Sequence, residues 1–205
     1  MPEFAPSTRP GPGEAAVVRG AGAELVALAA GGAFQLLVDG GGEGGGGAFG
    51  ANRLTLTEGA DGARPHFHAR SSELFYVLGG VAEFLLGDRP TTAAAGDLLV
   101  VPPGLPHAFG AAPGSTADLL VVMSPAVERF GYFRHLGRIA AGQDSFDGLL
   151  AEQDRYDVHF TDPAPWQRAR SGDVRSGDVR PRDVWSGDAR SREVRPGDTW
   201  SRDVR

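Results

Sequence analysis

The sequence contains neither cysteine nor lysine. Without cysteine the chain has no thiolate nucleophile, no cysteine-ligated zinc site and no iron–sulfur cluster. Without lysine it cannot form a Schiff base, anchor pyridoxal phosphate or build a P-loop. All twenty basic residues are therefore arginine, and nucleophilic or metal chemistry must come from other side chains.

Long apolar runs are also scarce. The stretch from Ala21 to Val38 is apolar, but Glu24, Gln35 and three glycines interrupt it, which favours two strands over a membrane span. Residues 1–19 are rich in proline and acidic residues and lack the apolar core of a signal peptide. A net charge of −6 argues against nucleic acid as the main partner. We expect a cytoplasmic protein that binds neither nucleic acid nor a membrane.

Short apolar runs separated by turn residues fill the chain from about residue 15 to 124. Many short strands at spacings of about ten residues are typical of an all-β sandwich or barrel. The pair Gly79-Gly80 separates two of the runs and predicts a hairpin. The expected strands are Ala15–Arg19, Glu24–Ala29, Phe34–Asp39, Asn52–Glu58, Arg64–Ala69, Glu73–Leu78, Val81–Leu86, Asp97–Val101, His107–Gly110 and Ala117–Met123.

The pattern changes to a helical period after Met123. We expect one helix over Pro125–Leu136, with Ser124 as its N-cap, and a second over Ser145–Tyr156. From Ser171 to the end, seven pentapeptides follow one another, alternating in charge and offering only Val, Ala or Thr as small apolar residues. Such a composition favours a disordered tail over a folded repeat. The expected layout is an N-terminal arm (1–14), a barrel (15–124), a helical extension packed on it (125–166) and a tail (167–205).

Three of the five histidines gather in one pattern with a glutamate. His66 and His68 are two residues apart on an expected strand, so both imidazoles point to one face. Glu73 opens the next strand, and His107 follows a rigid turn rich in proline and glycine. Three imidazoles and one carboxylate suit one divalent transition metal, which could be Fe, Mn, Co, Ni, Cu or Zn. The alternatives are histidines that only form hydrogen bonds, or a barrel that has lost its metal.

These residues fall into two motifs of the cupin superfamily. The first, G-x5-H-x-H-x4-E-x6-G, has His66, His68, Glu73 and Gly80 in place, although Ala60 stands where the leading glycine is expected. The second, G-x5-P-x-G-x2-H, runs from Gly96 to His107, with Ala111 at the place of a closing asparagine. Residues 15–124 therefore resemble a cupin, which implies a double-stranded β-helix, or jelly-roll, barrel with a short C-terminal helical extension.

Together with the flanking segments 128–130 and 152–160, the chain resembles the bacterial single-domain quercetin 2,3-dioxygenases. The resemblance implies a 3-His-1-Glu metal site, O₂ as cosubstrate, and opening of a flavonol or similar aromatic enol with release of CO. Glu73 would accept the substrate's hydroxyl proton. The alternatives are another small-molecule cupin enzyme and a non-catalytic ligand-binding or sensing cupin. A homodimer is also expected from cupins. Strand parity and helical spacing suggest an apolar substrate pocket made by Phe75, Val77, Phe109, Phe130 and Phe133.

Overall fold

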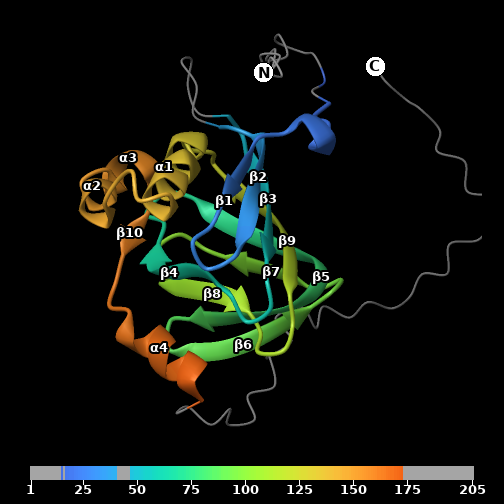
Figure 1. Ribbon diagram of the computed structural model, residues 1–205, viewed down its shortest axis with the longest axis vertical. Coiled ribbons are helices and arrows are strands. Elements are labelled where there is room, and N and C mark those ends of the chain that lie inside the picture. The colour runs from blue at the N-terminus through green and yellow to red at the C-terminus, as the bar shows by residue number, and fades with distance from the viewer. Residues whose placement is uncertain (1–14, 16, 41–46, 173–205) are drawn as a thin grey trace, which may run out of the picture. The chain divides into compact units, whose positions relative to one another are not determined.

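Ten antiparallel strands among the described residues form a sheet that curls on itself (Figure 1). The computed structural model describes residue 15, residues 17–40 and residues 47–172. The strands are β1 (Leu25–Ala27), β2 (Gly32–Val38), β3 (Gly50–Leu56), β4 (Asp61–Phe67), β5 (Ser72–Leu86), β6 (Arg89–Ala94), β7 (Leu98–Val101), β8 (His107–Ala111), β9 (Ala117–Ser124) and β10 (His159–Phe160). The all-β barrel predicted from the sequence is confirmed.

The sheet has two halves that share strand β5. Its order is β1-β2-β3-β9-β5-β8-β4-β10, and β6 and β7 also pair with β5. The first part of β5 pairs with β7 and β9, and the last part pairs with β6 and β8. Because β5 continues from one half into the other, the inward faces of the two halves enclose a single core.

The hairpin expected at Gly79-Gly80 is wrong, because β5 runs without a break through both glycines. The register with β9 shifts between Val77 and Gly79, which marks a β-bulge. The positions in the main core are odd-numbered up to Val77 and even-numbered at Ala82 and Phe84, as one extra residue requires, whereas the buried Leu85 packs separately against Trp166. Gly80 has φ of +71°, and a Cβ there would meet the Thr116 carbonyl oxygen at 1.9 Å. The glycine pair therefore bends a strand instead of ending one.

Alternation along the strands fills the interior with apolar side chains. In β3 the even positions, Asn52, Leu54 and Leu56, are buried while the residues between them are more exposed. Three phenylalanine rings stack edge-on or tilted in the centre, with centroids 4.9–5.9 Å apart. They are Phe75, Phe84 and Phe109. This aromatic cluster lies next to the expected metal ligands, since the Phe75 ring also meets the His107 ring.

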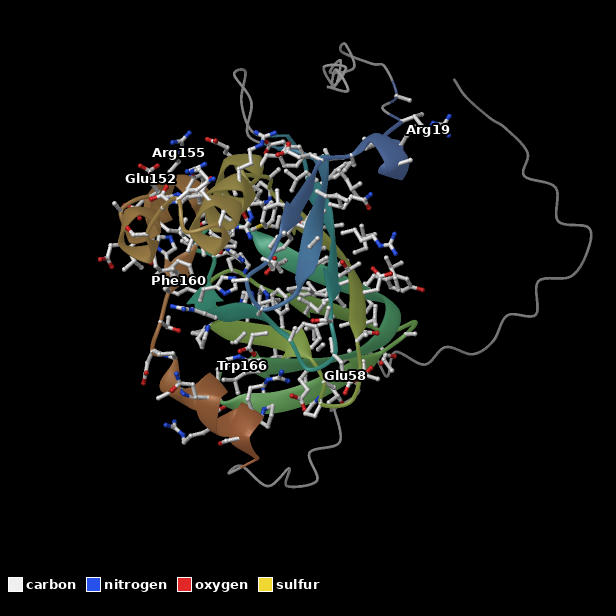
Figure 2. The ribbon with its side chains drawn as sticks, viewed as in Figure 1. Arg19, Glu58, Glu152, Arg155, Phe160 and Trp166 are labelled. Carbon is white, nitrogen blue, oxygen red and sulfur yellow. The ribbon has the colours of Figure 1, made fainter. Side chains whose placement is uncertain are left out.

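Three helices gather at one end of the sheet (Figure 1). They are α1 (Phe130–Ala140), α2 (Phe146–Leu150) and α3 (Gln153–Tyr156). Ser145, which we expected inside a helix, is the N-cap of α2 and accepts the Gly148 N–H. The expected second helix is thus divided into α2 and α3. Figure 2 shows Glu152 and Arg155 at this helical end, where Arg155 also pairs with Glu128 at 3.1 Å.

The first helix begins five residues later than we expected. Ser124 does not cap it, because it is the last residue of β9 and its hydroxyl donates to the Ala48 carbonyl. The helix begins at Phe130 instead, and Asp39, from the end of β2, accepts the Arg129 N–H. A cap supplied from a distant part of the chain leaves no local sequence signal, so the expected start was wrong.

A fourth helix, α4 (Ala164–Ser171), crosses residue 167, where we expected the tail to begin. Trp166 packs against Leu85 and Ala108, and Figure 2 shows it on the side of α4 next to the strands. Arg170 donates to the Glu83 carboxylate at 2.7 Å and to the carbonyl of Ala111 at 2.8 Å. The N-terminal arm and the pentapeptides beyond Gly172 lie outside the described residues.

The strand expected over Ala15–Arg19 is not formed by the residues of this range that the structure describes. Val17 and Val18 are exposed and pair with no strand, and the chain then makes a 3-10 turn at Gly20–Gly22. The two strands predicted between Ala21 and Val38 are present as β1 and β2, and they pair with each other in antiparallel fashion. None of the described helices is both long and apolar enough to cross a membrane.

Candidate metal centre

The four expected ligands lie together in the interior. Their ligand atoms are all within 4.8 Å of one another, and no side chain of the group is more than about 3% exposed. His66 is near the end of β4, His68 follows that strand, Glu73 is near the start of β5, and His107 opens β8. His66 and His107 are direct partners across the two strands. The two-residue step does bring His66 and His68 to one point, with ring centroids 4.9 Å apart.

The turn before His107 is fastened to the loop that carries His68. Gly104 has φ of +79°, a conformation that favours glycine. Its N–H donates to the carbonyl of His68 at 2.7 Å. The prolines at 102 and 103 restrict the backbone just before it. This turn therefore places His107 relative to His68 by a direct backbone hydrogen bond.

Each imidazole is oriented by a backbone carbonyl. Nδ1 of His66 lies 2.7 Å from the Arg64 oxygen, and Nδ1 of His107 lies 3.0 Å from the Leu105 oxygen. Nδ1 of His68 contacts the Asp157 carbonyl in the same way. Because a carbonyl can only accept, Nδ1 carries the proton and Nε2 keeps the lone pair that a metal needs.

Glu73 completes the donor set. Its Oε2 lies 3.1 Å from Nε2 of His68 and 2.9 Å from Nε2 of His107. Two ligands of one ion, each about 2.1 Å from it and at right angles, would be about 3.0 Å apart. Lone pairs on nitrogen and oxygen at this distance repel unless a cation lies between them. The four residues therefore fit a transition metal and could hold one.

Electrostatics prepare these groups for metal binding. Burial, with the neighbouring His107 and His68, holds the pKa of His66 well below its ordinary value of 6.5, so its imidazole is neutral at pH 7. Burial by itself would raise the pKa of Glu73. The electrostatic influence of the adjacent His68 and His107 outweighs burial and holds that pKa well below 4.5. The site thus combines a neutral imidazole with an ionised carboxylate.

Asp157 supports the site from behind. Its carboxylate accepts the backbone N–H groups of Ala69 at 2.8 Å, Arg70 at 3.1 Å and Ser71 at 3.2 Å. These residues form the loop between His68 and Glu73, and the Asp157 carbonyl orients His68. The residue has φ of +51°, which aspartate tolerates better than most residues do. Asp157 therefore fixes the loop that joins two ligands.

A cavity opens next to His66 and Glu73. Of the expected pocket residues, Phe109 and Phe133 line it, whereas Phe75 and Val77 lie fully buried in the core and Phe130 is outside the lining. The cavity volume is about 20 Å³, room for one water molecule. A larger ligand could enter only if side chains that line the cavity moved.

Polar residues that we did not expect also line this cavity. They are Asn52, Arg129 and Tyr132, each no more than 7% exposed. Burial raises the pKa of Tyr132 to about 12, so its hydroxyl stays protonated. Two signals could have found them. Asn52 shares strand parity with Leu54 and Leu56. Tyr132 and Phe133 follow Arg129 by three and four residues, which is the spacing of residues on one face of a helix.

Residues 52–123 match the family model described as the cupin domain, and this segment contains all four candidate ligands. The match supports the cupin superfamily that the two motifs indicated. No curated protein matches the sequence.

Solved structures of similar fold include three bacterial proteins. An RmlC-like cupin from Shewanella frigidimarina is 26% identical, with 57% of this chain and 96% of that chain covered and a TM-score of 0.47. The polyketide cyclase RemF from Streptomyces resistomycificus is 25% identical, covering 54% and 80%, with a TM-score of 0.45. The Streptomyces nucleoside dehydratase Pac13 is 17% identical, covering 57% and 88%, with a TM-score of 0.46.

Proposed function

We propose that this chain is a metal-dependent cupin dioxygenase of the quercetinase type, which opens an aromatic or similar enol with O₂. The supporting observation is the divided role of the Glu73 carboxylate. Oε2 faces the two histidines, while Oε1 lies on the side of Arg129, at 4.0 Å from its Nη2. One residue can therefore serve both as ligand and as base.

His66, His68, Glu73 and His107 would hold the ion. When bound, a divalent transition metal supplies Lewis acidity, which makes an enolic hydroxyl easier to ionise, and a centre for O₂ chemistry. Glu73 is ionised, and its Oε1 is the oxygen placed to accept the hydroxyl proton. The rings of Phe34, Phe109 and Phe133 line the cavity and exclude water from the reacting group.

A specific observation favours a second candidate, a cupin enzyme for a smaller enolic substrate. A cavity of about 20 Å³ admits a flavonol only after side chains that line it move outward. A substrate of a few carbon atoms needs a smaller movement. The metal centre and the base would be the same in both cases, so the two candidates differ in substrate and share the chemistry.

The test uses full-length protein loaded separately with Fe, Mn, Co, Ni, Cu and Zn, with metal content measured for each sample. Quercetin is added without oxygen, air is then admitted, and O₂ uptake and CO release are recorded. The proposal predicts one CO for each O₂ consumed, and loss of both in Glu73→Gln. Silence from every fully metallated sample would refute the flavonol reaction. O₂ uptake with small enolisable ketones would then support the second candidate. Tight binding with no turnover would indicate a non-catalytic cupin.

A homodimer has a candidate surface on the outer face of β5 and β7. Leu78, Leu98 and Val100 are 46–59% exposed there. Apolar residues exposed side by side, unlike single scattered ones, are typical of a contact surface. We propose this face as the dimer contact. Light scattering of the wild type and of Leu98→Glu tests it, because a dimer through this face becomes a monomer in the variant, while an unchanged mass would exclude it.

A further inference from the structure

The cavity contains a buried guanidinium that the enolic reaction does not use. Arg129 is 7% exposed. Its Nη1 makes one long hydrogen bond, 3.4 Å to the Tyr156 carbonyl, and its Nη2 is 4.0 Å from Glu73. Nε has no hydrogen-bond partner among the described residues. A guanidinium has five N–H donors, so most of its capacity is not met by these contacts.

Stacking holds the guanidinium in place without satisfying its donors. The Arg129 carbon Cζ lies 4.7 Å from the centroid of the Tyr132 ring and 5.3 Å from that of Phe133. Contacts with ring faces fix the plane of the group, and the N–H bonds lie in that plane. The backbone N–H of Arg129 is tied to Asp39, which is outside the cavity lining. The side chain is therefore oriented before any ligand arrives.

A second buried donor lines the same cavity. Asn52 is 5% exposed, and its Nδ2 has no hydrogen-bond partner among the described residues. A buried donor without a partner costs free energy, and natural proteins keep few of them. It points inward from β3, whereas Arg129 comes from the segment before α1. Two unrelated elements thus bring unsatisfied donors to one small space beside the metal ligands.

The charge of the lining also favours an anion. With a divalent ion in place and its histidine ligands neutral, as metal ligation requires, the ion, the Glu73 carboxylate and the Arg129 guanidinium sum to +2. A buried excess of positive charge attracts a ligand of opposite sign. A neutral flavonol carries no negative charge. The small cavity also favours a ligand smaller than a flavonol.

We propose that Arg129 and Asn52 form a carboxylate-binding subsite. The substrate is then a small 2-oxo carboxylate, whose keto group, on the carbon next to the carboxylate, can enolise. This inference rests on the second candidate of the proposed function, a cupin enzyme for a small enolic substrate, because it assigns the substrate class of the same metal centre. Arg129 receives the carboxylate, Asn52 donates to one of its oxygens, and Glu73 faces the enolic hydroxyl.

The test compares pyruvate with butane-2,3-dione, which has the same shape but no carboxylate. Each is titrated into full-length protein loaded with Co²⁺, and binding is followed by the visible absorption of the ion. Arg129→Met should weaken pyruvate binding about 10- to 100-fold, the range for a hydrogen bond to a charged group. Butane-2,3-dione should change less than threefold. Arg134→Met is the control, because that arginine is exposed on the same helix and pairs with Glu24.

Asn52→Leu keeps the inference testable if Arg129→Met does not fold. Removing a donor without a partner should raise the melting temperature by about 2–8 °C, whereas pyruvate binding should weaken about 2- to 10-fold. If Asn52 only stabilised the fold, Asn52→Leu would lower the melting temperature instead. Metal content is measured in every sample. Equal responses to the two probes in metallated protein would overturn the substrate class alone, and a wild type that binds no Co²⁺ would overturn the metal centre itself.

Discussion

Asp157→Asn is the sharpest test of how the ligand loop is held. The carboxylate receives three backbone N–H groups with its two oxygens, at 2.8–3.2 Å. Asparagine tolerates φ of +51° and has nearly the same shape. However, asparagine has only one side-chain oxygen. Its NH₂ group therefore faces at least one of the three backbone N–H groups, so that two donors meet and no hydrogen bond forms between them. One hydrogen bond is lost, and two lose their ionic character.

The expected cost follows from these contacts. A hydrogen bond to a charged group contributes about 1.5–3 kcal/mol and a neutral one about 1 kcal/mol, so losing one such bond and weakening two should cost about 3–7 kcal/mol. For a chain of this size that lowers the melting temperature by about 6–28 °C. Metal affinity should fall about 10- to 100-fold, as is usual when a group that orients a ligand is lost. Calorimetry and metal titration measure the two effects. Asp154→Asn, on an exposed side chain three residues away, is the control.

The pH dependence gives an independent check. Burial alone would raise the pKa of Asp157, but the N–H groups of Ala69 and Arg70 and the charge of Arg70 lower it below 3.8. A lowered pKa in the folded state stabilises the protein above the ordinary aspartate range, and this contribution is lost as pH falls through the lowered pKa. The stability difference between wild type and Asp157→Asn should therefore shrink in acid. A difference that stays constant down to pH 2, or a variant as stable as Asp154→Asn at pH 7, would refute the reasoning.

Three further outcomes are expected. His66→Ala should lose bound metal, measured by elemental analysis, while circular dichroism keeps its β signal; a variant with stoichiometric metal would contradict the ligand assignment. Metal-free protein should lose stability as pH falls below about 6.5, because unfolded His66 takes up a proton that the folded side chain, with its lowered pKa, refuses; a melting temperature that is flat from pH 7 to 5 would exclude this. Gly80→Ala should destabilise by about 2 kcal/mol or more in a denaturant titration, since its Cβ meets a carbonyl in a left-handed conformation. Gly79→Ala, with only a 3.8 Å contact, is its control.

The ligand set could be predicted from sequence because its geometry is local. A two-residue step on a strand fixes the direction of His66 and His68, and the turn at Gly104 determines the approach of His107. The barrel followed from the same alternation of apolar and polar residues. The direction of each ligand side chain depends on neighbours within a few positions, so short-range rules predict it, whereas the meeting of the ligands depends on the pairing of β4 with β8.

Other features depend on contacts between distant segments. Gly79-Gly80 has the composition of a turn, and only its pairing with β9 shows that it is a bulge. Asp39 caps a helix 90 residues later in the chain. Asp157 supports a loop 86–88 residues earlier. Sequence patterns carry no signal for such pairs, so the start of α1 and the support of the ligand loop became visible only in the fold.

The shared strand β5 gives the metal ligands a consequence for the stability of the whole barrel. Glu73 belongs to the half of the sheet with β7 and β9, whereas His66 and His107 come from β4 and β8 in the other half. An ion held by all of them would act as a removable crosslink between the two halves. At a free metal concentration a hundred times its dissociation constant, such a crosslink adds about 2.7 kcal/mol to folding. The cell's supply of metal would then set the lifetime of the folded protein as well as its activity.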